Sequence, residues 1–68
     1  MKLWVARDKD GGLYLYNYAP HKNTTGRFTC SIKPDGEWSE EYALNSHLFP
    51  EVTFENSPQE VELKLVNQ

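Results

Sequence analysis

Two runs of alternating aliphatic and aromatic residues, separated by a turn-forming cluster, constrain the fold of this chain more than any other feature. The runs cover residues 3–6 and 13–18, and the cluster Asp-Lys-Asp-Gly-Gly occupies residues 8–12. Glycine supplies the positive φ angle that a tight reversal needs, so this pattern predicts a β-hairpin. We expect its strands at residues 2–8 and 13–18.

The register of this hairpin determines which side chains share a face. If residues 9–11 form the loop, Val5 pairs with Leu15. One face then carries Leu3, Val5, Leu13 and Leu15, and the other carries Trp4, Ala6, Tyr14 and Tyr16. A loop longer by one residue mixes the two sets, but both faces stay largely apolar. Such a hairpin needs a cover or a partner.

The middle of the chain contains further strand and turn signals. Residues 27–32 alternate, with Phe28, Cys30 and Ile32 on one side, and predict a third strand. Residues 19–26 and 33–37 are rich in turn formers and predict a surface loop and a tight turn. The stretch from Trp38 to Leu44 fits a strand or a short helix capped by Ser39, and we favour the strand. Residues 46–49 fit one helical turn that ends before Pro50, and residues 52–54 a short extended piece.

The last segment carries two conflicting signals. Residues 57–60, Ser-Pro-Gln-Glu, form a capping box with proline at the first helical position. Val61, Leu63 and Leu65, however, alternate with charged residues, and hydrophobic periodicity is the primary signal, so we expect a strand over residues 60–66. The sequence therefore predicts a mainly β fold: a small curled antiparallel sheet of four to five strands with one short helical turn.

Length and charge bound the function. A chain of 68 residues makes one domain, residues 1–68, and is too short for a cofactor fold beside a substrate site. The net charge of -3, without a basic run, provides no long-range attraction to nucleic acid or to a membrane. A single cysteine excludes an internal disulfide, and Arg7 interrupts the opening apolar stretch, so we expect a cytoplasmic protein without a secretion signal. No apolar run is long enough to span a bilayer.

No residue pattern predicts catalysis, a metal or a cofactor. Asp8 and Asp10 fit the hairpin turn and lack the spacing of a calcium loop. His21, His47 and Cys30 do not have the spacing of a zinc site or of a nucleophile pair. The glutamates fit solvated faces and a charged edge strand, because the chain is too short for a glycosidase cleft. We therefore expect no enzyme activity and no cofactor.

The candidate binding site is an aromatic row that consists of Trp4, Tyr14, Tyr16 and Tyr18. Exposed on a sheet, such a row can anchor a protein interface or stack single-stranded bases. Alternatively, later apolar residues cover the row and complete the core with it; they are Trp38, Tyr42, Leu44, Leu48, Phe49 and Phe54.

The acidic balance decides between the partners of an open row. It favours a protein partner or a second copy of the chain over nucleic acid. The sequence thus predicts a non-catalytic protein-interaction module that uses the aromatic sheet face. A single-stranded nucleic-acid-binding module and a small enzyme or accessory subunit are the two alternatives.

The opening of the chain also has the pattern W-x-A-R-D-x-D-G-x-L-x-L, within residues 4–16. This opening, residues 49–55 (Phe-Pro-Glu-Val-Thr-Phe-Glu), Pro58 and residues 61–63 together resemble a group of small bacterial proteins. The resemblance covers roughly half of the chain. That group has no assigned activity, so the resemblance implies a bacterial protein and no functional residue.

Overall fold

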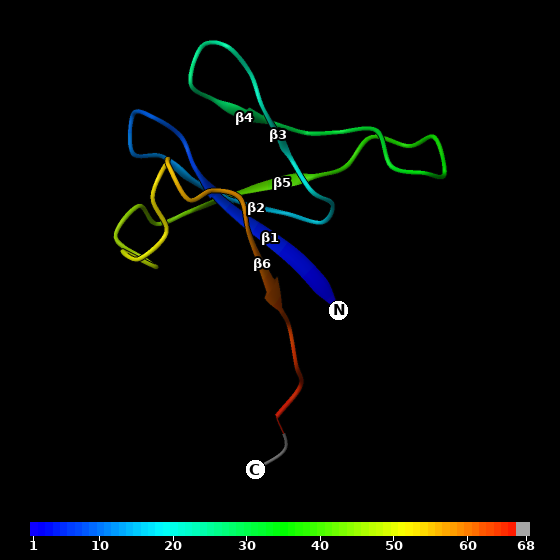
Figure 1. Ribbon diagram of the computed structural model, residues 1–68. Helices are drawn as coiled ribbons and strands as arrows, with labels where there is room; N and C mark the ends of the chain where they lie inside the picture. Colours follow the sequence, from blue (N-terminus) through cyan, green and yellow to red (C-terminus); the bar gives the residue numbers. More distant parts are fainter. Residues whose placement is uncertain (67–68) are drawn as a thin grey trace.

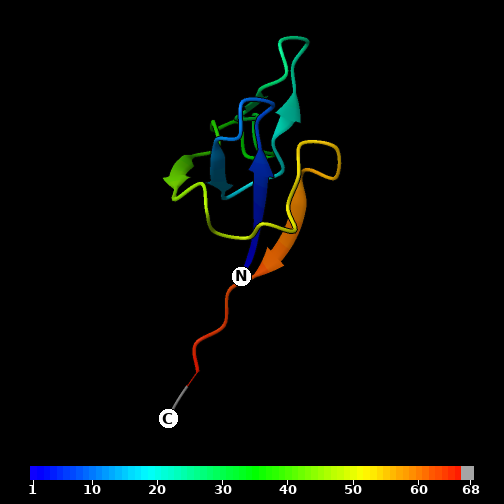
Figure 2. The ribbon, with the colours of Figure 1, turned by 90° about the vertical axis from the view of Figure 1, so that its left-hand side faces the viewer.

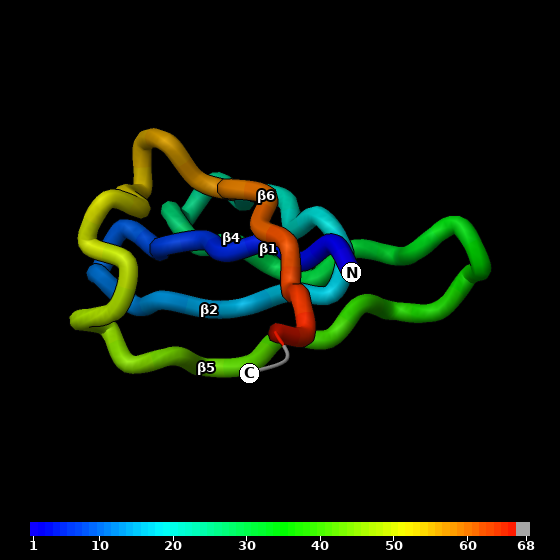
Figure 3. The backbone as a smooth tube through the Cα atoms, turned by 90° about the horizontal axis from the view of Figure 1, so that it is seen from below, coloured from blue at the N-terminus to red at the C-terminus, as the bar shows by residue number. Residues whose placement is uncertain are grey.

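The computed structural model describes residues 1–66 and shows an all-β chain (Figure 1). Four strands form an antiparallel sheet in the order β5-β2-β1-β6, which Figure 3 shows from below. They are β1 (Lys2–Arg7), β2 (Leu13–Tyr16), β5 (Glu41–Leu44) and β6 (Gln59–Glu62). Two short strands, β3 (His21–Lys22) and β4 (Phe28–Thr29), pair separately. The prediction of a mainly β, antiparallel fold is confirmed.

The N-terminal hairpin has the predicted register. Val5 lies opposite Leu15 and Trp4 opposite Tyr16. The Asp8 amide donates to the Gly12 carbonyl at 2.8 Å, and Gly11 adopts a φ of 97°, which a residue with a side chain rarely takes. The glycine cluster therefore sets which residues face each side of the sheet.

Each face of this hairpin has its own cover, as an apolar two-sided hairpin requires. On the Val5 face, Val5, Leu13 and Val52 are buried together, with Leu15, Leu44 and Val61 packed around them. On the Tyr16 face, the buried group consists of Ala6, Tyr16 and Phe28, with Trp4, Tyr14, Cys30 and Phe54 around it. Residues 45–58 supply the first cover, and β4 together with Phe54 supplies the second.

Two polar side chains at the end of β1 hold these covers. The Arg7 guanidinium donates hydrogen bonds to four backbone carbonyls between residues 46 and 52. The acceptors are Ser46, Leu48, Phe49 and Val52, and the bond to Val52 is 2.6 Å long. Asp8 is buried, and its carboxylate accepts a hydrogen bond from the Phe28 amide at 2.9 Å and lies 3.5 Å from the Arg27 Nε. Charge-assisted hydrogen bonds of this kind are stronger than neutral ones, so both covers are fixed to one end of β1.

Three details of the middle segment differ from the sequence prediction. Residues 46–49 form a turn instead of the predicted helical turn. The Asn45 side-chain oxygen accepts a hydrogen bond from the His47 amide, and the Asn45 backbone carbonyl accepts one from the Leu48 amide. His21 and Lys22 pair with β4 instead of belonging wholly to a loop. The third strand is only Phe28–Thr29, and Ile32 is 57% exposed because it pairs with Trp38 in a protruding turn that closes on itself.

The C-terminal segment is a strand, as periodicity predicted, and the alternative helix is wrong. β6 pairs with β1, with Val61 opposite Leu3, so the capping box does not start a helix. The strand ends at Glu62 instead of continuing to Val66. Leu63 still exchanges backbone hydrogen bonds with Met1, and residues 64–66 then run away from the sheet, as Figures 1 and 2 both show.

Candidate functional site

Tyr16, the centre of the predicted aromatic row, is a core residue. Its side chain has an exposed fraction of 0%, and its hydroxyl donates to the Phe28 carbonyl at 3.2 Å. Burial raises the pKa of Tyr16 above its usual value of 10.0, with smaller contributions from the Glu41 and Asp8 carboxylates. A partner cannot reach this ring while the Phe28 cover is in place.

The other members of the row are half-buried. Trp4 and Tyr18 pack against each other, with ring centroids 5.9 Å apart, whereas Tyr14 packs on the Tyr16 core. Of the six residues expected as a possible cover, Phe54 lies over this face, and Leu44 packs on the opposite one. The structure therefore divides the predicted row into one buried ring and three partly exposed rings.

The larger open apolar surface lies on the Val5 face. There, an open groove of about 430 Å³ crosses the sheet between the strands and the turn at residues 46–49. Its lining is almost wholly apolar and consists of Leu3, Val5, Leu15, Leu44, Leu48, Phe49, Val61, Glu62 and Leu63. Leu48 and Phe49 form the wall and keep 47% and 44% of their surface exposed. We call this surface the Val5-face groove.

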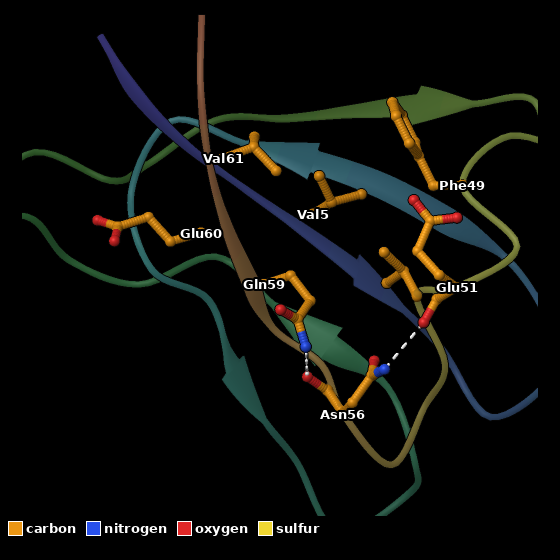
Figure 4. A pocket seen from close by; sticks show the side chains of 8 residues that line it. Val5, Phe49, Glu51, Asn56, Gln59, Glu60 and Val61 are labelled. Carbon is orange, nitrogen blue, oxygen red and sulfur yellow. Dashed lines mark hydrogen bonds between the residues drawn. The ribbon is translucent and has the colours of Figure 1, made fainter.

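A more polar hollow of about 410 Å³ adjoins the groove and shares Val5, Phe49 and Val61 with it. Figure 4 shows this hollow, with the Asn56 side chain donating to the Glu51 carbonyl and the Gln59 side chain donating to the Asn56 carbonyl. The Glu60 side chain points away from it. These amide groups are already engaged with backbone, so the apolar groove is the part available to a ligand.

The groove wall is held in a strained conformation. Phe49 has a φ of 49°, in the left-handed region that costs an ordinary residue about 1 kcal/mol. Arg7 donates to the Phe49 carbonyl at 3.2 Å, and the Val52 amide donates to the same oxygen at 2.9 Å. These bonds keep the Phe49 ring beside the groove.

Both ring nitrogens of His21 are hydrogen-bonded, whereas His47 is an exposed residue of the turn at residues 46–49. His21 Nε2 lies 2.9 Å from the Thr29 hydroxyl, and Nδ1 lies 3.2 Å from the Ser31 hydroxyl. Ser31 donates its proton to the Ala19 carbonyl, so it accepts from His21 Nδ1. Over residues 1–66, no three His, Cys, Asp or Glu side chains gather as metal ligands would. In the same range the chain has no helix that could cross a membrane.

Sequence reasoning missed the groove because it considered Leu48 and Phe49 only as a possible cover of the tyrosine face. The available signal was the Leu13, Leu15 and Leu3 set, which needs a wider cover than one valine at position 52 provides. The chain matches no protein-family model, no curated protein and no solved structure in comparisons with known proteins.

Proposed function

We propose that this protein is a non-catalytic protein-interaction domain that binds an extended apolar segment of a partner chain in the Val5-face groove. The observation that carries the proposal is the open apolar lining between the sheet and the turn at residues 46–49. Contiguous apolar surface that a chain leaves uncovered is typical of a protein-binding site. The strained Phe49, fixed by Arg7, supports a preformed wall.

An extended ligand fits the shape of the groove floor. The floor is formed by residues from β5, β2, β1 and β6, whose side chains repeat at every second residue along each strand. The two outer strands, β5 and β6, flank it and offer backbone edges to which an additional strand can add. A partner with alternating apolar side chains would contact both the edge and the groove.

The tyrosine row is at most a secondary surface in this proposal. Tyr16 is excluded by burial, and the rings of Trp4, Tyr14 and Tyr18 are each partly covered. Among residues 1–66, the Lys22 ammonium lies over the rings of Phe28 and Phe54, 4.1 Å from the Phe54 centroid. Phe28 and Phe54 belong to the cover of the Tyr16 face, so Lys22 lies over the cover and not over the tyrosine row. A base-stacking platform combines its exposed rings with adjacent positive charge.

We also place the protein in the bacterial cytoplasm. The lone Cys30 suits a reducing compartment, and the sequence resemblance described above supports a bacterial source.

Peptide titration followed by NMR tests the proposed function. The probe is a short peptide of alternating leucine and lysine, and its control replaces the leucines by serine. We expect shifts at Leu15, Leu44 and Val61 with the leucine peptide alone. Leu48→Ser should weaken binding severalfold, whereas Ile32→Ser, a matched change on the protruding turn, should not.

Two results would contradict the proposal. One is an absence of groove shifts at millimolar leucine peptide in a folded protein. The other is a set of NMR shifts confined to Trp4 and Tyr18. If a single-stranded oligonucleotide produces the same shifts, and added salt abolishes them, the tyrosine row binds nucleic acid instead.

A further inference from the structure

The outer edge of β6 presents backbone groups from alternate residues. Met1 and Leu63 exchange both backbone hydrogen bonds, at 2.9 and 3.4 Å, and are therefore a hydrogen-bonded pair. Such pairs alternate along an antiparallel ladder, so residues 59, 61 and 63 direct their N–H and C=O groups toward β1. Glu60, Glu62 and, beyond them, Lys64 direct theirs outward.

The chain that continues from this edge exposes alternate apolar side chains. Leu63 and Leu65 are 59% and 92% exposed, and Val66 is exposed as well. Figure 2 shows β6 beside β1, with residues 63–66 continuing past the end of β1. β6 is an outer strand, and from Gln59 to Val66 the chain has no proline, so its unpaired backbone groups are a template for pairing with another strand.

The charges along this segment are complementary to themselves. When the segment pairs antiparallel with an identical segment, and Leu63 lies opposite Leu63, Glu62 lies opposite Lys64 and Lys64 opposite Glu62. If the two-fold axis lies at Glu62 instead, Glu62 faces Glu62, and Lys64 faces Glu60, which already pairs with Lys2 at 3.6 Å. If it lies at Lys64, Lys64 faces Lys64. Like charges directly opposite are destabilising, so the first register is favoured. It also places residues 62 and 64, which point outward, in the hydrogen-bonded positions.

We propose that two copies of this chain pair through β6 and residues 63–66 in this register, about a two-fold axis at Leu63. The sheet then continues from β5 of one copy to β5 of the other, in an isologous interface. Because the axis is perpendicular to the sheet, both Val5-face grooves lie on the same side. Leu65 of the second copy lies opposite Val61, so it covers the end of the groove that Val61 and Leu63 line.

This inference rests on the proposed function, because it names a second copy as one occupant of the groove. It adds a definite interface, in which the pair of Glu62 and Lys64 occurs once on each side of the two-fold axis. The oligomeric state therefore tests it separately from peptide binding.

Charge-reversal variants of the full chain, measured by sedimentation equilibrium, test the interface. We expect the wild-type chain to have the mass of two copies. Lys64→Glu and Glu62→Lys should each weaken self-association about tenfold, because every pair across the axis becomes repulsive. An equimolar mixture of the two variants should recover the paired mass, since each then faces the opposite charge. Lys33→Glu, the same change on the protruding turn, should associate like wild type.

Three outcomes overturn the dimer. They are a wild-type chain that stays monomeric at submillimolar concentration, variants that associate as strongly as wild type, and a mixture that fails to recover the paired mass. The leucine peptide, titrated into the Lys64→Glu variant, reports on the groove separately. Groove shifts with a monomeric wild type refute the dimer alone, whereas a dimer without groove shifts refutes the proposed function alone.

Discussion

Arg7 and Asp8 are neighbours in the chain but hold opposite covers of the sheet. The Arg7 side chain is bonded to the carbonyls of residues 46–52 on the Val5 face, whereas the Asp8 carboxylate accepts the Phe28 amide on the other. Successive residues of an extended chain point to opposite sides, which places the two side chains where each cover passes. These two adjacent residues therefore hold the covers on both faces of the sheet.

Arg7→Lys should destabilise the fold by about 2 kcal/mol, because a lysine ammonium cannot bond all the carbonyls that the planar guanidinium reaches. Arg27→Lys is the control, since Arg27 is largely exposed. Urea unfolding followed by tryptophan fluorescence measures both. Equal midpoints for Arg7→Lys and wild type would contradict the role of Arg7 as the holder of residues 46–52.

Asp8→Ala should cost about 1–3 kcal/mol, because it leaves the buried Phe28 amide without an acceptor. Asp8→Asn keeps an acceptor oxygen and should cost less, since it loses mainly the interaction with exposed Arg27. Thermal unfolding of the pair checks this order. If alanine is tolerated better than asparagine, the carboxylate does not hold β4 as described.

Tyr16 should make the protein lose stability at alkaline pH. Its pKa is raised in the folded state, so the protonated phenol is favoured there, and this contribution is complete below the unfolded value of 10.0. As pH rises above 10.0, the unfolded chain releases the proton first and the free energy of unfolding falls. Tyr16→Phe should remove this part of the alkaline loss, at a cost of about 1 kcal/mol at neutral pH for the lost hydrogen bond to Phe28.

Unfolding midpoints of wild type and Tyr16→Phe between pH 8 and 11 measure this effect. Tyr42→Phe is the comparison: the hydrogen bond to Glu40 raises the pKa of Tyr42, but the ring is exposed and solvent screens this interaction, so the alkaline loss should change less than in Tyr16→Phe. Parallel pH curves for wild type and Tyr16→Phe would contradict the burial of the Tyr16 hydroxyl.

Truncation of Val52 and of Leu48, both on the segment that covers the Val5 face, should change the free energy of unfolding by different amounts. Val52→Ala should cost about 2 kcal/mol because it opens a void beside Val5 and Leu13. Leu48→Ala should change stability by less than about 0.5 kcal/mol because Leu48 borders the open groove. Denaturant unfolding of the two variants measures whether the apolar contacts that stabilise the segment are concentrated at Val52. A large cost at Leu48 would show that the groove is closed in solution.

Local signals predicted the hairpin well. Glycine at position 11 and the alternation around it depend only on neighbouring residues, and they predicted the observed Val5 and Leu15 pair. Periodicity likewise predicted the strand at Val61 against the capping signal at Ser57. The Ser57 hydroxyl instead accepts the Arg7 amide, a contact fifty residues apart in sequence.

The covers were not predictable from such signals. Leu48 and Phe49 lie on the Val5 face because Arg7, about forty residues away in sequence, donates hydrogen bonds to their carbonyls. The local sequence around them does not indicate which face of the sheet they cover. Ile32 alternates like a core residue, yet its hairpin closes locally through Lys33 and Glu37 and has no sheet beneath it. Tyr16 is a core residue because β4 crosses its face, and β4 is held there by contacts between distant residues, such as the bond from the Phe28 amide to Asp8.

The guanidinium that holds the groove wall also donates to the Gly11 carbonyl at the tip of the hairpin, at 2.8 Å. A ligand that pushes Leu48 and Phe49 outward must lengthen their bonds to Arg7 and so pulls on that tip. Filling the groove is therefore mechanically linked to the β1–β2 turn, and a reporter group placed at Lys9 or Asp10 would register occupancy without touching the ligand.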